Sequence, residues 1–264
     1  MTSEKPYVLV EKKDHVATLT LNREERLNAF RMKDRLELAG LCAQLSKDPE
    51  VRVAIITGAG RGFCSGADVV TQPVGNIAGI DVREQFIDPV GGFIRDIYAF
   101  EKPLIAAING VAVGAGLSIA LAADIRIAAA SARFITAWVD RGLLPDAGGS
   151  YFLPRTVGFS WAAELTFTSD PIDAAMAERI GLVSHVVPDG HALSTAKALA
   201  AKIAEKPPIS LIHAKRNLRL GMQVPLEQQL LFESAGYKSV GQTEDFQEAI
   251  NSFREKRKGV YKGR

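Results

Sequence analysis

The sequence contains little of several residue types, and each shortage argues against a class of protein. Only two cysteines, Cys42 and Cys64, occur in the 264 residues. Their spacing does not match a zinc site, and two cysteines cannot build a disulfide framework, so we expect no metal and a cytoplasmic location. The formal net charge is only +2, and aromatic residues make up 7% of the chain. This balance argues against a nucleic-acid partner.

Long hydrophobic runs are also missing. The first 23 residues contain no apolar run behind basic residues, so no secretory signal is predicted. The most apolar region, residues 104–130, is interrupted by Asn109, Asp124 and Arg126. It is typical of a buried core and not of a transmembrane span, so we expect no membrane partner.

The segments that are present alternate between strand and helix patterns. Residues 7–23 predict two short strands joined by a turn, and residues 29–48 predict an amphipathic helix. The apolar strands that follow include one in "LIAAINGVAVGAG", residues 104–116, which is interpreted as a buried strand that enters a small-residue turn. Strands of this kind between helices predict an α/β fold with a parallel sheet covered on both faces.

Two later regions have a different character. Residues 71–92 contain Gly, Pro and Asn with weak periodicity, which predicts a loop lying over a site. After residue 190 the pattern is helical to the end, with four helices predicted and Thr243 as the N-cap of the last one.

Two of the predicted strands end in turns of small residues, "TGAGRGFCSGAD" and "INGVAVGAG". The first turn does not fit the dinucleotide-binding fingerprint, because Phe63 stands where the third glycine is needed. Each turn exposes backbone N–H groups, and two convergent N–H donors suit a developing oxyanion. Taken one at a time, the glycines are equally explained by tight strand-to-helix connections.

Three segments together resemble the crotonase (enoyl-CoA hydratase/isomerase) superfamily: "ITGAGRGFCSGADV", "KPLIAAINGVAVGAGLSIALAADIRIAA" and "ARFITAWVDRGLLPDAGGSYFLPRTVG". The resemblance covers nearly the whole chain. It implies a spiral of ββα units over residues 1–200 and a helical region, residues 201–264, for CoA contacts and assembly into a homotrimer or a dimer of trimers. It also implies an acyl-CoA substrate and no other cofactor, with the N–H groups of Ala67 and Ala115 holding the thioester oxygen.

The carboxylates distinguish branches of this family. Hydratase members have two glutamates, at positions that are Ser118 and Trp138 in this chain. The stretch "LLPDAGGSYFLPR" instead resembles the branch that includes the phenylacetate-pathway isomerases, which implies that Asp146 is the acid/base. The alternative interpretation is that Asp146 caps the following helix, and both roles are compatible.

Trp138 lies eight positions before Asp146. A similar spacing occurs in chlorobenzoyl-CoA dehalogenases, where the tryptophan N–H orients a nucleophilic aspartate. Those enzymes also use a histidine, and residues 80–103 contain none. The other interpretation of Trp138 is an aromatic wall of the acyl pocket.

The remaining candidates complete the expected site. Ser65, Asp68 and Leu143 are expected to contact substrate, with Asp68 also capping a turn. By resemblance, Phe253 and Lys256 match residues that contact the CoA nucleotide, in some members across a subunit boundary.

The predicted reaction is isomerisation of an enoyl-CoA or related ring-containing acyl-CoA by proton transfer. The alternatives are an enoyl-CoA hydratase that uses one carboxylate or adds Glu84, an aryl-CoA dehalogenase, and a non-catalytic acyl-CoA-binding protein.

Overall fold

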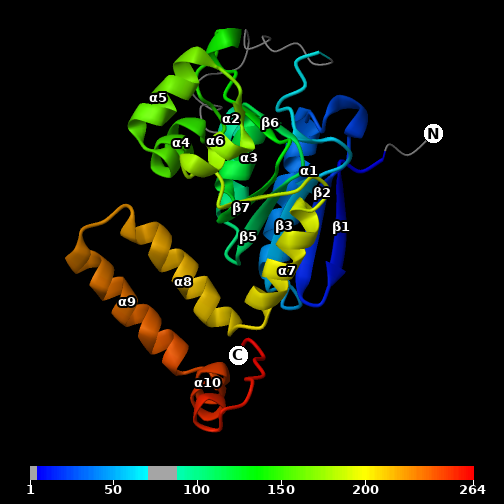
Figure 1. Cartoon of the computed structure of the whole chain (residues 1–264). Coiled ribbons are helices and arrows are strands. Elements are labelled where there is room, and N and C mark those ends of the chain that lie inside the picture. Colours follow the sequence, from blue (N-terminus) through cyan, green and yellow to red (C-terminus); the bar gives the residue numbers. More distant parts are fainter. Residues whose placement is uncertain (1–4, 71–87) are drawn as a thin grey trace.

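Two β-sheets of different size form the centre of the computed structural model (Figure 1), which describes residues 5–70 and 88–264. The larger sheet has the strand order β1-β2-β3-β5-β7-β10. Its strands are β1 Val8–Lys13, β2 Val16–Leu21, β3 Val53–Gly58, β5 Leu104–Ile108, β7 Ile125–Ala129 and β10 His185–Val187. The hairpin partners β1 and β2 are antiparallel, and all other neighbours are parallel. The predicted hairpin and parallel sheet are confirmed.

The smaller sheet has the order β4-β6-β8-β9. Its strands are β4 Gly62–Cys64, β6 Val111–Val113, β8 Arg133–Ile135 and β9 Ile172–Asp173. The chain passes three times from the larger sheet to the smaller one, from β3 to β4, from β5 to β6 and from β7 to β8. This repeated step gives the fold its spiral.

The prediction of a buried strand that enters a small-residue turn within residues 104–116 is confirmed for β5, but it missed the second strand, β6, which follows the turn at Asn109 and Gly110. The Asn109 side chain accepts a hydrogen bond from Gly58 N at 3.2 Å and donates one to Gly60 O at 2.8 Å. Gly110 packs so closely that a Cβ atom there would lie 2.0 Å from the Arg61 carbonyl oxygen. An asparagine followed by a glycine therefore directs the chain from one sheet to the other.

Ten helices and two 3-10 turns accompany the sheets in the part of the chain that the structure describes. They are α1 Met32–Lys47, α2 Asp88–Tyr98, α3 Ala115–Ala122, α4 Gly149–Val157, α5 Phe159–Thr168, α6 Ala174–Arg179, α7 Ala192–Ala204, α8 Pro208–Gly221, α9 Leu226–Gly241, α10 Glu244–Arg254, η1 Glu24–Arg26 and η2 Val139–Arg141. The four predicted C-terminal helices are confirmed, and Thr243 Oγ1 caps α10 by accepting a hydrogen bond from Phe246 N at 3.0 Å.

The predicted loop at residues 71–92 is wrong at its end, because α2 already begins at Asp88. Residues 71–87, which include Glu84, lie outside the described residues.

Alternate side chains of the central strands pack into two separate cores. In β3, Val53 and Ile55 face the core shared with α7, whereas Ala54 and Ile56 face the core shared with α1, α2 and α3. The buried residues that α7 contributes to the first of these cores are alanines spaced four apart, Ala192, Ala196, Ala200 and Ala204. Small residues at this spacing lie on one helix face and let α7 pack closely on the sheet. The prediction of a sheet covered on both faces is confirmed.

The helices α8 to α10 extend away from the sheets (Figure 1). Asp124, just after α3, anchors α8 by contacting Lys215 Nζ and Arg219 Nη2, each at 2.7 Å. The same carboxylate accepts a hydrogen bond from Leu104 N at 2.8 Å, which connects the end of α3 to the start of β5.

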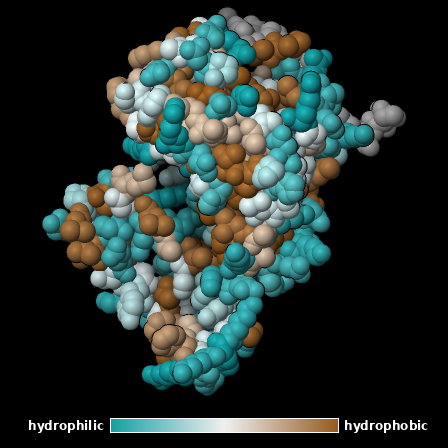
Figure 2. Space-filling model, in the orientation of Figure 1, coloured by the Kyte–Doolittle hydropathy of each residue, from teal (hydrophilic) through white to brown (hydrophobic). Residues whose placement is uncertain are grey.

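Several large apolar side chains lie on the surface of α9, and Figure 2 shows hydrophobic side chains along this arm. They are Leu226, Leu230, Leu231 and Phe232. The oligomer predicted for this region and the division at residue 200 stay predictions. Within residues 5–70 and 88–264, no helix combines the length and the apolar character needed to cross a bilayer.

Candidate active site

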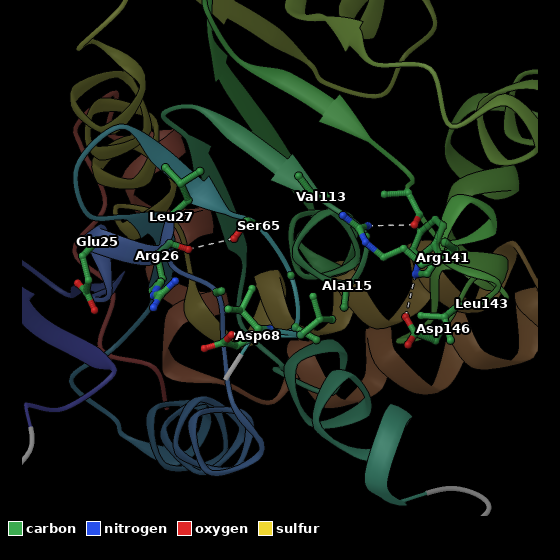
Figure 3. Close-up of a pocket in the computed structure, with 18 of the residues that line it drawn as sticks. Glu25, Arg26, Leu27, Ser65, Asp68, Val113, Ala115, Arg141, Leu143 and Asp146 are labelled. Atoms are coloured by element: carbon green, nitrogen blue, oxygen red, sulfur yellow. Dashed lines mark hydrogen bonds between the residues drawn. The ribbon is translucent and has the colours of Figure 1, made fainter. Parts of the chain in front are cut away.

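A cavity of about 380 Å³ opens where η1, the β3–β4 region, the start of α3 and the segment after β8 meet (Figure 3). It is lined by the predicted site residues Ser65, Ala67, Asp68, Ala115, Trp138, Leu143 and Asp146. Phe253 and Lys256 do not line it; Phe253 is 82% exposed on α10, and Lys256 follows that helix. Their proposed CoA contact stays a prediction.

Ala67 lies in the first small-residue turn, which pairs with Phe30 in the segment before α1. The backbone of Phe30 donates to Gly66 O and accepts from Asp68 N, both at 2.9 Å. In a parallel bridge of this kind, the intervening residue directs its own N–H to the opposite side. The Ala67 N–H therefore faces away from Phe30, and no acceptor among the described residues pairs with it.

Ala115 begins helix α3 in the second turn. Gly114 precedes it with φ +52°, a conformation that favours glycine. The first N–H groups of a helix have no intrahelical acceptor and carry part of the positive end of the helix dipole. The two turns adjoin, because a Cβ atom on Gly66 would lie 3.7 Å from Ala115 N. The cavity thus contains a neighbouring pair of backbone donors from two separate turns.

Asp146 lies half-buried on the opposite side of the cavity from Asp68 (Figure 3). Its Oδ1 accepts a hydrogen bond from Trp138 Nε1 at 2.8 Å. Burial raises the pKa of the Asp146 carboxyl, and the Trp138 hydrogen bond and the Arg35 charge oppose that rise. A raised pKa brings a carboxylate closer to the range where it serves as a general base.

The alternative of Asp146 as a helix cap is wrong. Helix α4 begins at Gly149, its N-cap is Gly148, and the cap has no side-chain hydrogen bond. The backbone carbonyl of Asp146 accepts from Gly149 N at 2.7 Å, which leaves the carboxylate free to face Trp138. The geometry therefore excludes the cap, and the acid/base role of Asp146 stays a prediction.

Trp138 is 3% exposed and packs between the second turn and the start of α4. A Cβ atom on Gly149 would lie 2.6 Å from the indole, and one on Gly114 would lie 3.8 Å from Nε1. Ser118, fully buried beneath, donates to the carbonyl of Asp146 at 3.3 Å. The indole thus occupies a slot that only glycine at position 149 leaves open, and its N–H edge is directed at the carboxylate.

Asp68 makes the turn contact that the sequence predicted and one that it did not. Its Oδ1 accepts from Val70 N at 3.1 Å, and its Oδ2 lies 2.6 Å from Arg23 Nη1. The Arg23 and Asp68 side chains are 13% and 3% exposed, so this ion pair is largely buried. No sequence signal connected the two residues, because they are 45 positions apart and meet only through the fold.

The cysteines take no part in this arrangement. Cys64 is buried beside the first turn with its Sγ bonded to the Asn28 carbonyl at 3.2 Å, and burial raises the pKa of its thiol to about 12. Among the residues that the structure describes, no group of three or more His, Cys, Asp or Glu side chains suits a metal ion.

Comparison with known proteins agrees with the architecture and the turns. The model of the enoyl-CoA hydratase/isomerase family matches residues 11–264. The chain belongs to this family. It is 36% identical over 262 residues to the 1,2-epoxyphenylacetyl-CoA isomerase of Escherichia coli, covering 98% of this chain and 99% of the relative.

Other relatives have different named activities. The short-chain-enoyl-CoA hydratase of Clostridium acetobutylicum is 39% identical over 253 residues, covering 95% of each chain. The crystal structure of an enoyl-CoA hydratase from Bacillus anthracis superimposes with a TM-score of 0.91 at 35% identity, covering 98% of this chain and 100% of that one. The crotonase fold and the acyl-CoA enzyme family are therefore established, and relatives named isomerase and hydratase both match over nearly the full length.

Proposed function

We propose that this protein isomerises an enoyl-CoA, or a related ring-containing acyl-CoA, by moving a proton through a thioester enolate. The observation that carries the proposal is the pairing of one aligned carboxylate with two backbone donors in a single cavity. The Trp138 indole donates a hydrogen bond to Asp146, and Ala67 and Ala115 line the same cavity. No cofactor is needed beyond the CoA that the substrate carries.

Each group has a defined task in this reaction. The Ala67 and Ala115 N–H groups bind the thioester oxygen and stabilise the negative charge that develops on it, by about 3 kcal/mol per donor. Asp146 removes a proton from the acyl chain and returns it to another carbon. The Trp138 hydrogen bond fixes which carboxylate oxygen is presented, so the indole is a positioning residue.

Hydration is the second candidate, because close relatives are named hydratases. Water addition uses one group to activate water and another to handle the α-proton. Among the described residues that line the cavity, the other carboxylates are Glu25 and Asp68, and both contact Arg23. Asp146 is thus the one cavity carboxylate without an ion-pair partner there, which favours a proton shuttle over hydration.

The Trp138–Asp146 hydrogen bond would also suit a nucleophilic aspartate, as dehalogenation requires. The segment 80–103 lacks a histidine to assist such a step. Dehalogenation is therefore kept as an outcome of the test and not as the proposal.

The test compares the parent protein with Asp146→Asn on a panel of 2-enoyl-, 3-enoyl- and halogenated aryl-CoA thioesters in deuterated water. Asp140→Asn is the matched control, since Asp140 is exposed on η2 and does not line the cavity. We expect double-bond migration and deuterium uptake by the parent and by Asp140→Asn. Asp146→Asn should lose at least about a hundredfold in both.

Four results would contradict the proposal. Asp146→Asn as active as the parent would remove the carboxylate from the mechanism. Accumulation of 3-hydroxyacyl-CoA would establish the hydratase, and halide release would establish the dehalogenase. Binding of every thioester without turnover would leave the protein as an acyl-CoA-binding member.

A further inference from the structure

The N–H group of Ala67 lies in a turn whose local sequence does not fix its direction. The peptide that carries this N–H follows Gly66, whose φ is +90°, and glycine adopts positive φ about as readily as negative φ. A Cβ atom on Gly66 would lie 2.8 Å from the Val113 carbonyl oxygen, so the close packing requires glycine at this position. The direction of the Ala67 N–H must therefore be fixed by contacts from other segments.

The segment before α1 supplies backbone contacts of this kind. The Leu27 carbonyl accepts a hydrogen bond from Ser65 N at 2.9 Å, and Phe30 pairs with the residues on both sides of Ala67. These bonds hold the neighbours of Ala67 and leave its own N–H directed away from the segment. The turn at residues 65–68 thus lies against residues 27–30 through main-chain hydrogen bonds.

The ion pair between Arg23 and Asp68 adds a side-chain contact between the same two segments. Asp68 directly follows Ala67, and its Oδ2 lies 2.6 Å from Arg23 Nη1. The same Nη1 donates to the Ala29 carbonyl at 3.1 Å, and Arg23 N donates to Asn28 Oδ1 at 2.9 Å. Arg23 therefore joins the carboxylate beside the donor to the segment on which the turn lies.

Asn28 extends this network to the other end of the turn. Its Nδ2 donates to the Ala59 carbonyl at 2.9 Å and to the Gly62 carbonyl at 2.8 Å. Gly62 begins β4, and β4 ends at the residue before the turn. Arg23 is thus connected to both ends of the turn, through its guanidinium at one end and through its backbone N–H and Asn28 at the other.

The pair also sets the charge beside the donor. Asp68 lines the cavity one residue after Ala67, and its carboxylate points away from Asp146 (Figure 3). A negative charge at this place would oppose the charge that develops on an oxygen bound at Ala67 N. Arg23 supplies a positive charge 2.6 Å away, in a largely buried pair that salt screens little. The carboxylate can therefore orient the turn without weakening the donor.

We propose that Arg23 is a positioning residue that holds Asp68 and thereby directs the Ala67 N–H at the thioester oxygen. Arg23 does not line the cavity, so it acts through Asp68 and the turn. The inference rests on the proposed function for the role of Ala67 as a donor to the thioester. It does not depend on which residue moves the proton.

The test measures the polarisation of the thioester carbonyl by infrared difference spectroscopy. The probe is hexanoyl-CoA, isotopically labelled at the carbonyl so that its band is identified, and kcat is measured with hex-3-enoyl-CoA. Binding to the parent should lower the C=O stretching frequency. Arg23→Met should lose about half of that shift and about a hundredfold in kcat, because one of two donors is misdirected. The dissociation constant of hexanoyl-CoA should change by less than about threefold.

Two further variants separate positioning from charge. Arg23→Lys keeps the cation and should recover at least about tenfold of the lost kcat together with part of the carbonyl shift. Asp68→Asn keeps an acceptor for Val70 N, removes the ion pair and leaves the Arg23 charge in place. If the pair positions the donor, Asp68→Asn should lose kcat and carbonyl shift as Arg23→Met does. Values equal to or above those of the parent would mean that the pair acts by charge alone, which overturns the inference.

Arg52→Met is the matched control. Arg52 is half-buried, donates to the Ala204 and Tyr261 carbonyls at 3.0 and 2.7 Å, and does not line the cavity. Urea unfolding of every variant identifies losses that come from stability alone, and Arg23→Lys and Asp68→Asn give the result if Arg23→Met does not fold. A carbonyl shift and kcat that Arg52→Met lowers as much as Arg23→Met does would overturn the inference.

The carbonyl measurement also separates this inference from the proposed reaction. Asp146→Asn should bind hexanoyl-CoA with the carbonyl shift of the parent, because Asp146 is not a donor to the oxygen. If Asp146→Asn stays active, the proton-transfer proposal fails, and a carbonyl shift that depends on Arg23 still supports the positioning role. A parent that shows no carbonyl shift on binding, or variants of Arg23 and Asp68 that retain the full shift, would refute that role.

Discussion

Replacement of Trp138 by phenylalanine isolates the hydrogen bond to Asp146. The phenyl ring keeps an aromatic group in the slot above Gly149 and removes the only N–H that reaches the carboxylate from this residue. Because the bond stabilises the ionised form, its loss raises the pKa of Asp146 further above its ordinary value. The acid limb of kcat/KM should therefore move to higher pH.

The size of the effect follows from the geometry. A 2.8 Å hydrogen bond to a half-buried ionised group contributes about 1.5–3 kcal/mol. At any pH below the limb, the ionised fraction falls by the corresponding factor, about tenfold to a hundredfold. At high pH Asp146 is ionised in both proteins, so their rates should become similar. The difference that remains then reports the poorer alignment of the Asp146 carboxylate without the Trp138 hydrogen bond.

The measurement is deuterium uptake into a 3-enoyl-CoA, followed from pH 5 to pH 10. Trp161→Phe is the matched control, because Trp161 lies on α5, is 36% exposed and does not line the cavity. Urea unfolding of all three proteins separates the packing cost of the smaller ring, about 1–3 kcal/mol, from the effect on the base.

A uniform rate reduction with the acid limb unmoved would refute this reasoning. Trp138 would then act through packing alone, and its N–H would have no influence on the protonation of Asp146.

Further predictions concern the donors and the stability of the fold. Ala115→Pro removes one N–H at the first position of α3, where proline is tolerated. We expect kcat to fall about a hundredfold or more, with little change in the free energy of unfolding. A fall in kcat of less than about threefold would exclude this N–H as an oxyanion donor. Arg23→Met removes the cation of the largely buried ion pair with Asp68 and should cost about 3 kcal/mol in urea unfolding. Lys197→Met, which breaks an exposed pair, should cost under about 1 kcal/mol. Burial raises the thiol pKa of Cys42 and Cys64 to about 12. A disulfide reagent at pH 8 should therefore modify neither thiol until the protein unfolds. Fast labelling of both thiols in the native protein would contradict this burial.

Local pattern was enough to predict most of the elements, and the family motifs were enough to predict where they converge. The hairpin, the parallel strands and the four C-terminal helices each have a periodicity or cap that can be found in a short window, as Thr243 illustrates. The proximity of Ala67 and Ala115 came from the resemblance, because spacing alone cannot bring two turns together.

What the sequence could not predict depends on contacts between distant segments. The small residues of "INGVAVGAG" predict a turn, but the short strand β6 within this segment depends on pairing with β4 and β8, which lie elsewhere in the sequence. The Arg23–Asp68 pair has no local signature for the same reason. For Asp146, "PDAGG" was compatible with a helix cap as well as with an acid/base, and the cap is excluded only by the start of α4 at Gly149 with Gly148 as its N-cap.

Asp146 is the proposed base, and the burial that raises its pKa also lowers the stability of the folded state at neutral pH. A carboxyl whose pKa is raised by folding binds its proton more tightly in the native than in the unfolded chain. The native state therefore gains stability as the pH falls through the folded pKa, and it holds the ionised form at neutral pH at a cost. Asp146→Asn should accordingly unfold at higher urea concentration than the parent at pH 7, with the difference shrinking in acid. Turnover and resistance to unfolding then make opposite demands on a single side chain.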